Sequence, residues 1–368
     1  MPFWSFRFIK AFFIDMRKKY LDNIKWVTVV MVVIYHVLYM YNAEGILGVL
    51  GKITTLDVQY YDVFQYIVYP WFMLVLFMVS GISSRLYLND HSDKEFIRSR
   101  TTKLLVPSTI GVLVFQFIQG ILNVSLSEGL GGIELPLVIR ILIYLASGIG
   151  VLWYIQLLWV FSLILVLIRK IEKERLRDIG KKAGLPVLIA MVIPAYCAAQ
   201  ILNTPIIAVY RIGLYLFAFL LGYYVLSHDE VIDVLKRWFP LFLTVSIVLI
   251  AAFCIINFGD NYADKPVNRT LLFVWDGYFT SLAVIGGSAR YFDFDNGFTR
   301  WMSKRSFGLY VFHYMGISAV AVLIAKPGYL PPALTYLLTL IAGFGAGFIL
   351  NAVISRVPFF RWAVLGID

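Results

Sequence analysis

Long stretches without any charged side chain constrain this chain more than any other feature. Seven stretches of 16 to 29 residues hold no Asp, Glu, Lys or Arg; they are 26–41, 63–84, 104–127, 151–168, 238–259, 306–325 and 327–355. A helix crosses a bilayer with about 20 apolar residues. Only 15% of the 368 residues are charged and 60% are hydrophobic, against about 25% charged in soluble proteins. These numbers exclude a soluble enzyme, a disulfide scaffold and a disordered chain, and they predict an all-α, polytopic membrane protein.

The remaining spans come from two less regular regions. The apolar block 183–227 is interrupted only by Arg211, and the turn sequence Asn203-Thr204-Pro205 divides it into two spans. A further apolar stretch carries Asp276. We therefore expect one membrane domain over 1–368 with about ten transmembrane helices, preceded by an interfacial helix at 1–20. The expected spans lie near 24–41, 63–85, 104–126, 150–168, 185–202, 206–226, 238–258, 270–288, 306–325 and 332–354.

The basic residues predict the orientation. The chain has 32 Lys and Arg against 22 Asp and Glu, an excess that the positive-inside rule explains without a nucleic-acid partner. If 135–148 does not cross the membrane, 26 of the cations fall on one side and 5 on the other, with Arg211 inside a span. We therefore expect both termini in the cytoplasm and a re-entrant or interfacial segment at 135–148 on the outer side.

The first span combines a cation with a histidine. His36 follows Lys25 by eleven residues, about 16 Å along a helix and only about 20° past three full turns. Both side chains therefore share one face, with the cation at the cytoplasmic boundary and the imidazole near the midplane. A snorkelling lysine and a structural histidine would give the same pattern; the functional alternative is a path from a bound anion to a general base.

A second basic cluster precedes the third span. Arg98, Arg100 and Lys103 lie at the cytoplasmic edge, the last two one helical turn apart. Taken alone, positive-inside bias explains this cluster. Together with Lys25 it forms a basic mouth suited to phosphate groups.

Few other polar side chains are expected inside the membrane. Ser306, Tyr310 and His313 share one face of the ninth span, where His313 is structural or catalytic. Asp276 either pairs with Arg211 or binds an acceptor, and Trp153 either belongs to an aromatic belt or lines a sugar site. The sequence has no P-loop, no zinc-protease motif and no serine-hydrolase elbow, so no metal and no permanently bound cofactor is expected.

The order and spacing of these motifs resemble the acyltransferase 3 family of membrane acyltransferases over nearly the whole chain. The segment from Tyr20 through Asp22 and Lys25 to His36 resembles its opening motif, with the essential histidine eleven residues after a cation. Further matching pieces are Phe77-x-x-Ser80-Gly81, the run from Arg98 to Pro107, Leu152-Trp153-Tyr154, Phe219-x-x-Gly222-Tyr223 and Ser306-x-x-x-Tyr310-x-x-His313. The family usually has Arg at the position of Lys25 and often has Arg at the position of Lys103. Lys keeps the charge but lacks the planar, bidentate guanidinium group of Arg.

The resemblance implies transfer of an acyl group, acetyl or succinyl, from cytoplasmic acyl-coenzyme A to a hydroxyl of a cell-envelope or exported saccharide. On this interpretation His36 is catalytic, as a general base or a transient acyl carrier. Lys25, Arg98, Arg100 and Lys103 hold the donor phosphates, and Asp22, Trp153, Asp276, Ser306, Tyr310 and His313 support the site or bind the acceptor. The expected location is a bacterial cytoplasmic membrane. The alternative from another class is a transporter or flippase of a lipid-linked saccharide, which would have no use for coenzyme A.

Overall fold

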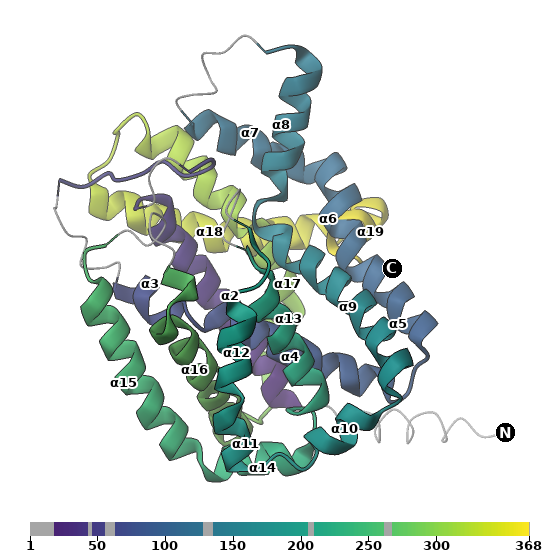
Figure 1. The fold of residues 1–368 in the computed structure, drawn as a ribbon. Helices are drawn as coiled ribbons and strands as arrows, with labels where there is room; N and C mark the ends of the chain where they lie inside the picture. The colour runs from purple at the N-terminus through teal and green to yellow at the C-terminus, as the bar shows by residue number, and fades with distance from the viewer. Residues whose placement is uncertain are drawn as a thin grey trace.

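The computed structural model describes residues 18–42, 46–55, 63–127, 135–204, 210–260 and 267–367 (Figure 1). Helices dominate these residues, and the two strands among them are β1 (Asn203–Thr204) and β2 (Tyr210–Arg211), which pair antiparallel. Most of the interfacial helix expected at 1–20 lies outside the described residues. The all-α architecture expected from the apolar stretches is confirmed.

Eight helical stretches are long and apolar enough to cross a membrane. They comprise α2 (Lys19–Met40), α3 and α4 (Val63–Val68 and Phe72–Leu88), α5 to α7 (Asp93–Arg100, Val106–Gly111 and Phe117–Leu126), α8 and α9 (Leu137–Ile149 and Trp153–Glu172), α15 (Phe239–Asn257), α16 (Leu271–Tyr291), α17 (Gly297–Val320) and α18 (Pro332–Ile354). The π-helices η2 (Thr101–Leu105) and η3 (Val112–Gln116) join α5, α6 and α7, and the 3₁₀ turn η4 (Gly150–Leu152) joins α8 to α9. The 3₁₀ turn η5 (Val267–Arg269) precedes α16, and the π-helix η6 (Ala321–Ala325) follows α17. The remaining short helices are α10 (Arg175–Gly180), α14 (Asp229–Arg237) and α19 (Pro358–Leu365).

The fifth and sixth expected spans are shorter than a full crossing. The first is represented by α11 (Leu185–Ala190) and α12 (Val192–Ala199), and the second by α13 (Ile212–Tyr224). A sharp bend of 107° separates α13 from α14. α14 carries acidic residues in its first turn and basic residues in its last turn. By length and composition the described residues therefore give eight spans, or nine with the bent pair, where ten were expected.

The segment expected to re-enter the membrane forms most of α8. This helix is apolar and largely exposed, and it passes through η4 into α9, with Gly150 at a φ of 35° at the joint. It packs closely along α7, because a Cβ at Gly120 would lie 1.7 Å from the carbonyl oxygen of Tyr144. In Figure 1 this pair of helices stands at one end of the molecule.

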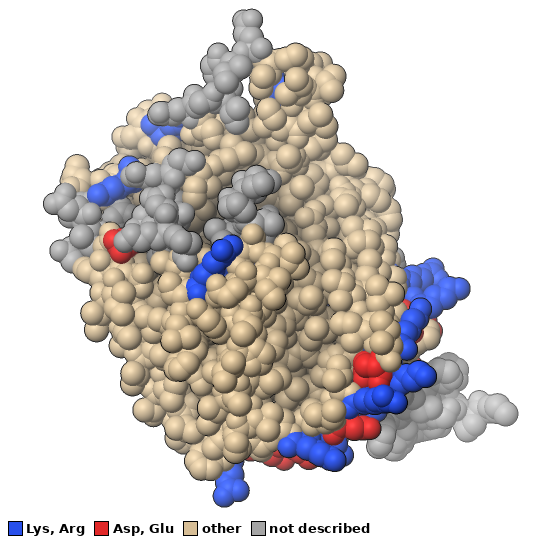
Figure 2. All heavy atoms as spheres, viewed as in Figure 1, with Lys and Arg blue, Asp and Glu red and all other residues tan. Residues whose placement is uncertain are grey.

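Charged side chains gather at the opposite end. Figure 2 shows Lys, Arg, Asp and Glu along the lower right edge, where Figure 1 places α5, α10 and α14, while the middle of the molecule is largely uncharged. The first helix here, α5, starts with a capping box in which Ser92 accepts from the backbone of Glu95 and the Glu95 carboxylate accepts from Ser92. This is the end that the positive-inside rule predicts to face the cytoplasm.

The most buried spans form the centre of the bundle. α4, α16 and α17 are mainly buried, whereas α15 and α18 present most of their surface outward. α4 and α13 approach each other through glycines: a Cβ at Gly81 would lie 2.0 Å from the carbonyl oxygen of Phe219, and one at Gly222 would lie 2.1 Å from that of Met78. Small residues permit this separation between membrane helices. The Phe77-x-x-Ser80-Gly81 and Phe219-x-x-Gly222-Tyr223 motifs therefore meet at the contact between α4 and α13.

Candidate active site

Two histidines from distant parts of the chain meet inside the bundle. His36 on α2 and His313 on α17 lie with Nδ1 of His36 3.0 Å from Nε2 of His313, and their ring centres are 5.0 Å apart. No cation and no carboxylate contacts either imidazole within the described residues. The two intramembrane histidines thus form one pair.

The backbone of α17 determines how protons are arranged in this pair. Nδ1 of His313 lies 2.8 Å from the carbonyl oxygen of Tyr310 and 3.2 Å from that of Leu309. Carbonyl oxygens only accept, so Nδ1 of His313 carries the proton and, in the neutral ring, Nε2 accepts from Nδ1–H of His36. This arrangement leaves Nε2 of His36 with a free lone pair, as a general base requires.

Burial distinguishes the two rings. The His313 side chain is fully buried, whereas His36 is partly exposed. His36 is flanked by the rings of Tyr35 and Tyr314, which meet it edge to face at 5.5 and 5.2 Å. Of the two rings, His36 is therefore the more accessible, and His313 contacts it from the buried side.

Two of the predicted basic residues contact serines near the C-terminal end of α4. Nζ of Lys25 donates to Oγ of Ser83 at 3.0 Å, and Nη2 of Arg100 donates to Oγ of Ser84 at 2.9 Å. Asp22 lies 3.8 Å from Lys25, one turn earlier on α2. Two of the four cations predicted to form the basic mouth, Lys25 and Arg100, thus contact adjacent serines that the sequence analysis did not single out.

The other two predicted cations are placed differently. Arg98 and Lys103 are exposed at the surface, and the structure does not bring them into contact with Ser83 or Ser84. Arg100 is held more firmly, because its guanidinium also lies over the ring of Phe96 at 5.0 Å. Of the three cations before the third span, Arg100 is therefore the best placed for a bound ligand.

A series of polar aromatic side chains connects this mouth with the histidine pair. The Ser84 hydroxyl, which accepts from Arg100, donates to the carbonyl oxygen of Ser80 at 2.7 Å, and the hydroxyls of Ser80 and Tyr154 share a 3.0 Å hydrogen bond. Its ring lies 6.0 Å from that of Tyr310, which lies 6.4 Å from His313. The sequence analysis named Tyr154 and Ser80 only as parts of family motifs. Their position between the basic mouth and the histidine pair was not evident from the sequence alone.

The remaining predicted residues do not join one cluster. The Ser306 hydroxyl donates to the carbonyl oxygen of Ser303 on its own helix, and the Tyr310 hydroxyl donates to that of Val151. The ring of Trp153 stacks on Tyr215 at 5.6 Å. The contacts of Tyr310 and Trp153 join different elements, whereas the Ser306 contact stays within α17.

Asp276 and Arg211 form no ion pair with each other among the described residues, so that alternative is not observed. Asp276 is fully buried on α16 and accepts from Thr280 at 2.8 Å, while its Oδ2 has no hydrogen-bond partner. The Arg211 guanidinium lies instead over the rings of Phe273 and Tyr69, at 4.4 and 4.5 Å. Aromatic faces, and not a carboxylate, surround this buried cation.

Comparison with known proteins agrees with this arrangement. The chain matches the family model described as an acyltransferase domain over residues 18–356, nearly its whole length. No curated protein and no solved structure matches the chain. The chain belongs to the acyltransferase 3 family, so it is a multi-pass membrane protein of an acyltransferase class. The resemblance expected from its motifs is confirmed.

Proposed function

We propose that this protein transfers an acyl group from acyl-coenzyme A, bound from the cytoplasm, to a hydroxyl of a cell-envelope or exported saccharide. Acetyl and succinyl groups are the expected cargo. The observation that carries the proposal is the contact between His36 and His313. His36 lies on the same face of α2 as Lys25, about 16 Å deeper in the membrane. A donor whose phosphates bind at the basic mouth would extend its pantetheine arm along this face toward His36.

The chemical step assigns one role to each histidine. Nε2 of His36 removes the proton of the acceptor hydroxyl while the oxygen attacks the thioester carbonyl. The carbon–sulfur bond then breaks, and the leaving thiolate takes up the proton from His36, so that free coenzyme A and the acyl ester are the products. His313 keeps the His36 ring oriented and stabilises the imidazolium by accepting from its Nδ1–H. The apolar surroundings limit hydrolysis of the thioester.

Nε2 of His36 would instead attack the thioester carbonyl if the acyl group passes through a covalent intermediate; the carbon–sulfur bond breaks and the coenzyme A thiolate leaves. In a second step the acceptor hydroxyl attacks the acyl carbon, the bond to Nε2 breaks, and the hydroxyl proton passes to the thiolate, so that the neutral imidazole is restored. Both routes use the same nitrogen, and both require the tautomer set by His313.

Calorimetric titration of the purified protein with coenzyme A tests the proposal against the transporter alternative. We expect saturable binding that weakens with rising salt, because phosphates pair with exposed cations. A protein that does not bind coenzyme A would support the transporter. The acceptor follows from the saccharide or lipid whose mass falls by one acyl unit when the gene is deleted.

A further inference from the structure

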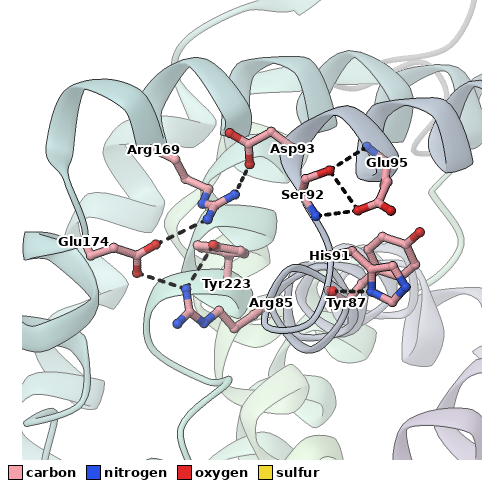
Figure 3. Close-up of polar contacts among 9 residues, drawn as sticks. All are labelled: Arg85, Tyr87, His91, Ser92, Asp93, Glu95, Arg169, Glu174 and Tyr223. Carbon is pink, nitrogen blue, oxygen red and sulfur yellow. Dashed lines mark hydrogen bonds and ion pairs between the residues drawn. The ribbon is translucent and has the colours of Figure 1, made fainter.

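Three arginines from three helices converge on one glutamate at the cytoplasmic end. Nη1 of Arg85, at the end of α4, lies 3.0 Å from Oε2 of Glu174, and Nη1 of Arg177, on α10, lies 3.6 Å from the same oxygen. Nη2 of Arg169, on α9, lies 3.4 Å from Oε1. Figure 3 shows the Glu174 carboxylate between Arg85 and Arg169. One carboxylate therefore occupies a cradle built by three guanidinium groups.

The position of Glu174 requires an unfavourable backbone. Lys173 and Glu174, the two residues between α9 and α10, have φ values of 49° and 66°. This left-handed conformation is unfavourable for non-glycine residues and persists only where other contacts hold it. Here the contacts are the three arginines. Burial raises the pKa of Glu174, but Arg85 and Arg169 lower it by more. The pKa therefore lies below its usual value, and the carboxylate is an anion at neutral pH.

The cradle remains positive even with the glutamate in place. Arg169 also pairs with Asp93, and the three arginines are thus offset by two carboxylates. The positive charge of the cradle also acts on His228, whose pKa is lowered by burial and then by Arg177 and Arg85. Both Glu174 and Arg177 have side chains about two-fifths exposed, at 38% and 44%, so a ligand can reach the cradle from the cytoplasm.

The cradle adjoins the basic mouth of the candidate active site. Arg85 directly follows Ser83 and Ser84, the serines that accept from Lys25 and Arg100. Its own guanidinium donates to the hydroxyl of Tyr223 at 3.2 Å, which directs it to the other side of α4. A molecule with two separate phosphate groups could therefore contact both sets of cations across the end of one helix.

We propose that Arg85, Arg169 and Arg177 form a second phosphate subsite, which binds the ribose 3′-phosphate of coenzyme A when the Glu174 side chain turns out to solvent. The proposal rests on the proposed function. A phosphate dianion presents three acceptor oxygens to the three guanidinium groups, more than the two of a carboxylate. Glu174 occupies the subsite without donor and keeps the arginines paired, and its departure releases the strained turn.

The test compares coenzyme A with 3′-dephospho-coenzyme A in calorimetric titrations of the full-length protein. Glu174→Gln removes the competing charge, so it should tighten coenzyme A binding about tenfold and change dephospho-coenzyme A binding less than about twofold. Arg177→Gln, at an exposed position, should weaken coenzyme A binding about tenfold without affecting the dephospho compound. If Glu174→Gln fails to fold, the Arg177→Gln result alone tests whether the subsite binds the 3′-phosphate.

Glu230→Gln is the matched control. Glu230 is a nearby exposed carboxylate paired with Lys181 at 3.1 Å, and its removal changes the cytoplasmic charge by the same amount. The ratio of the two affinities should not change in this variant. A subsite is ruled out if Glu230→Gln alters the ratio as much as Glu174→Gln, or if the Glu174 and Arg177 variants leave it unchanged. Failure of the wild-type protein to bind either compound would overturn the proposed function as well.

Discussion

At the scale of single residues, Ser83 and Ser84 connect parts of the chain that are far apart in sequence. They receive hydrogen bonds from Lys25 on α2 and from Arg100 at the end of α5. That Lys25 and His36 share one helix face could be predicted from their spacing, because both lie on one helix. The contact between His36 and His313 could not, because it depends on how α2 packs against α17.

Arg100→Ala tests the basic mouth. The variant should bind acyl-coenzyme A more weakly by about 1.5–3 kcal/mol, the value of one charge-assisted contact with phosphate. Acceptor affinity should stay the same, and titration with each substrate measures the two separately.

Arg300→Ala serves as the control, because Arg300 is an exposed residue paired with Asp295 at 3.1 Å. It should leave donor affinity unchanged. Equal donor affinity in the Arg100 variant and the wild type would remove Arg100 from the site.

At the scale of elements, the central contact is the crossing of α4 and α13. Gly81 and Gly222 each face backbone oxygen atoms of the other helix. The two motifs with these glycines were predicted as separate family features, and hydropathy gave no indication that they touch. Long helices overlap most of the long apolar stretches, but hydropathy did not indicate the shortness of α13 or the join between α8 and α9, because it does not register a bend.

Gly81→Ala should destabilise the protein, because the added methyl group overlaps the Phe219 carbonyl oxygen. Overpacking of this kind costs about 1–3 kcal/mol. Thermal unfolding in detergent should show a lower midpoint for this variant.

The comparison is Gly345→Ala on α18, where nothing lies within 4 Å of the added Cβ. That variant should match or slightly exceed the wild type, since Ala favours helix over Gly. A Gly81 variant as stable as the Gly345 variant would mean that α4 and α13 are not closely packed.

At the scale of the whole molecule, the asymmetry of charge predicts the orientation in the membrane. Cations gather at the end with α5, α10 and α14, as the count of basic residues on the two sides predicted. This feature was accessible from sequence because it depends on composition between spans and not on packing. Part of the predicted outer surface, 128–134, lies outside the described residues.

Single-cysteine labelling tests the orientation. With Cys197 and Cys254 replaced by Ala, Tyr329→Cys should react with an impermeant maleimide in intact cells, because Tyr329 is exposed beyond α17 at the end opposite the cations. Asp178→Cys on α10 should react only after the cells are permeabilised. Reaction at position 178 in intact cells would place the basic segment 169–182 outside and contradict the predicted orientation.

The most direct test of the whole account is the rate of acyl transfer by His36→Ala, measured as release of coenzyme A in the presence of acceptor. Loss of a general base should lower the rate by about 10²–10⁴-fold, and loss of a covalent carrier should abolish it, while coenzyme A still binds. His313→Ala should keep partial activity, because His313 only orients His36. Near-normal turnover by the His36 variant together with an inactive His313 variant would contradict the assignment and move the catalytic role to α17.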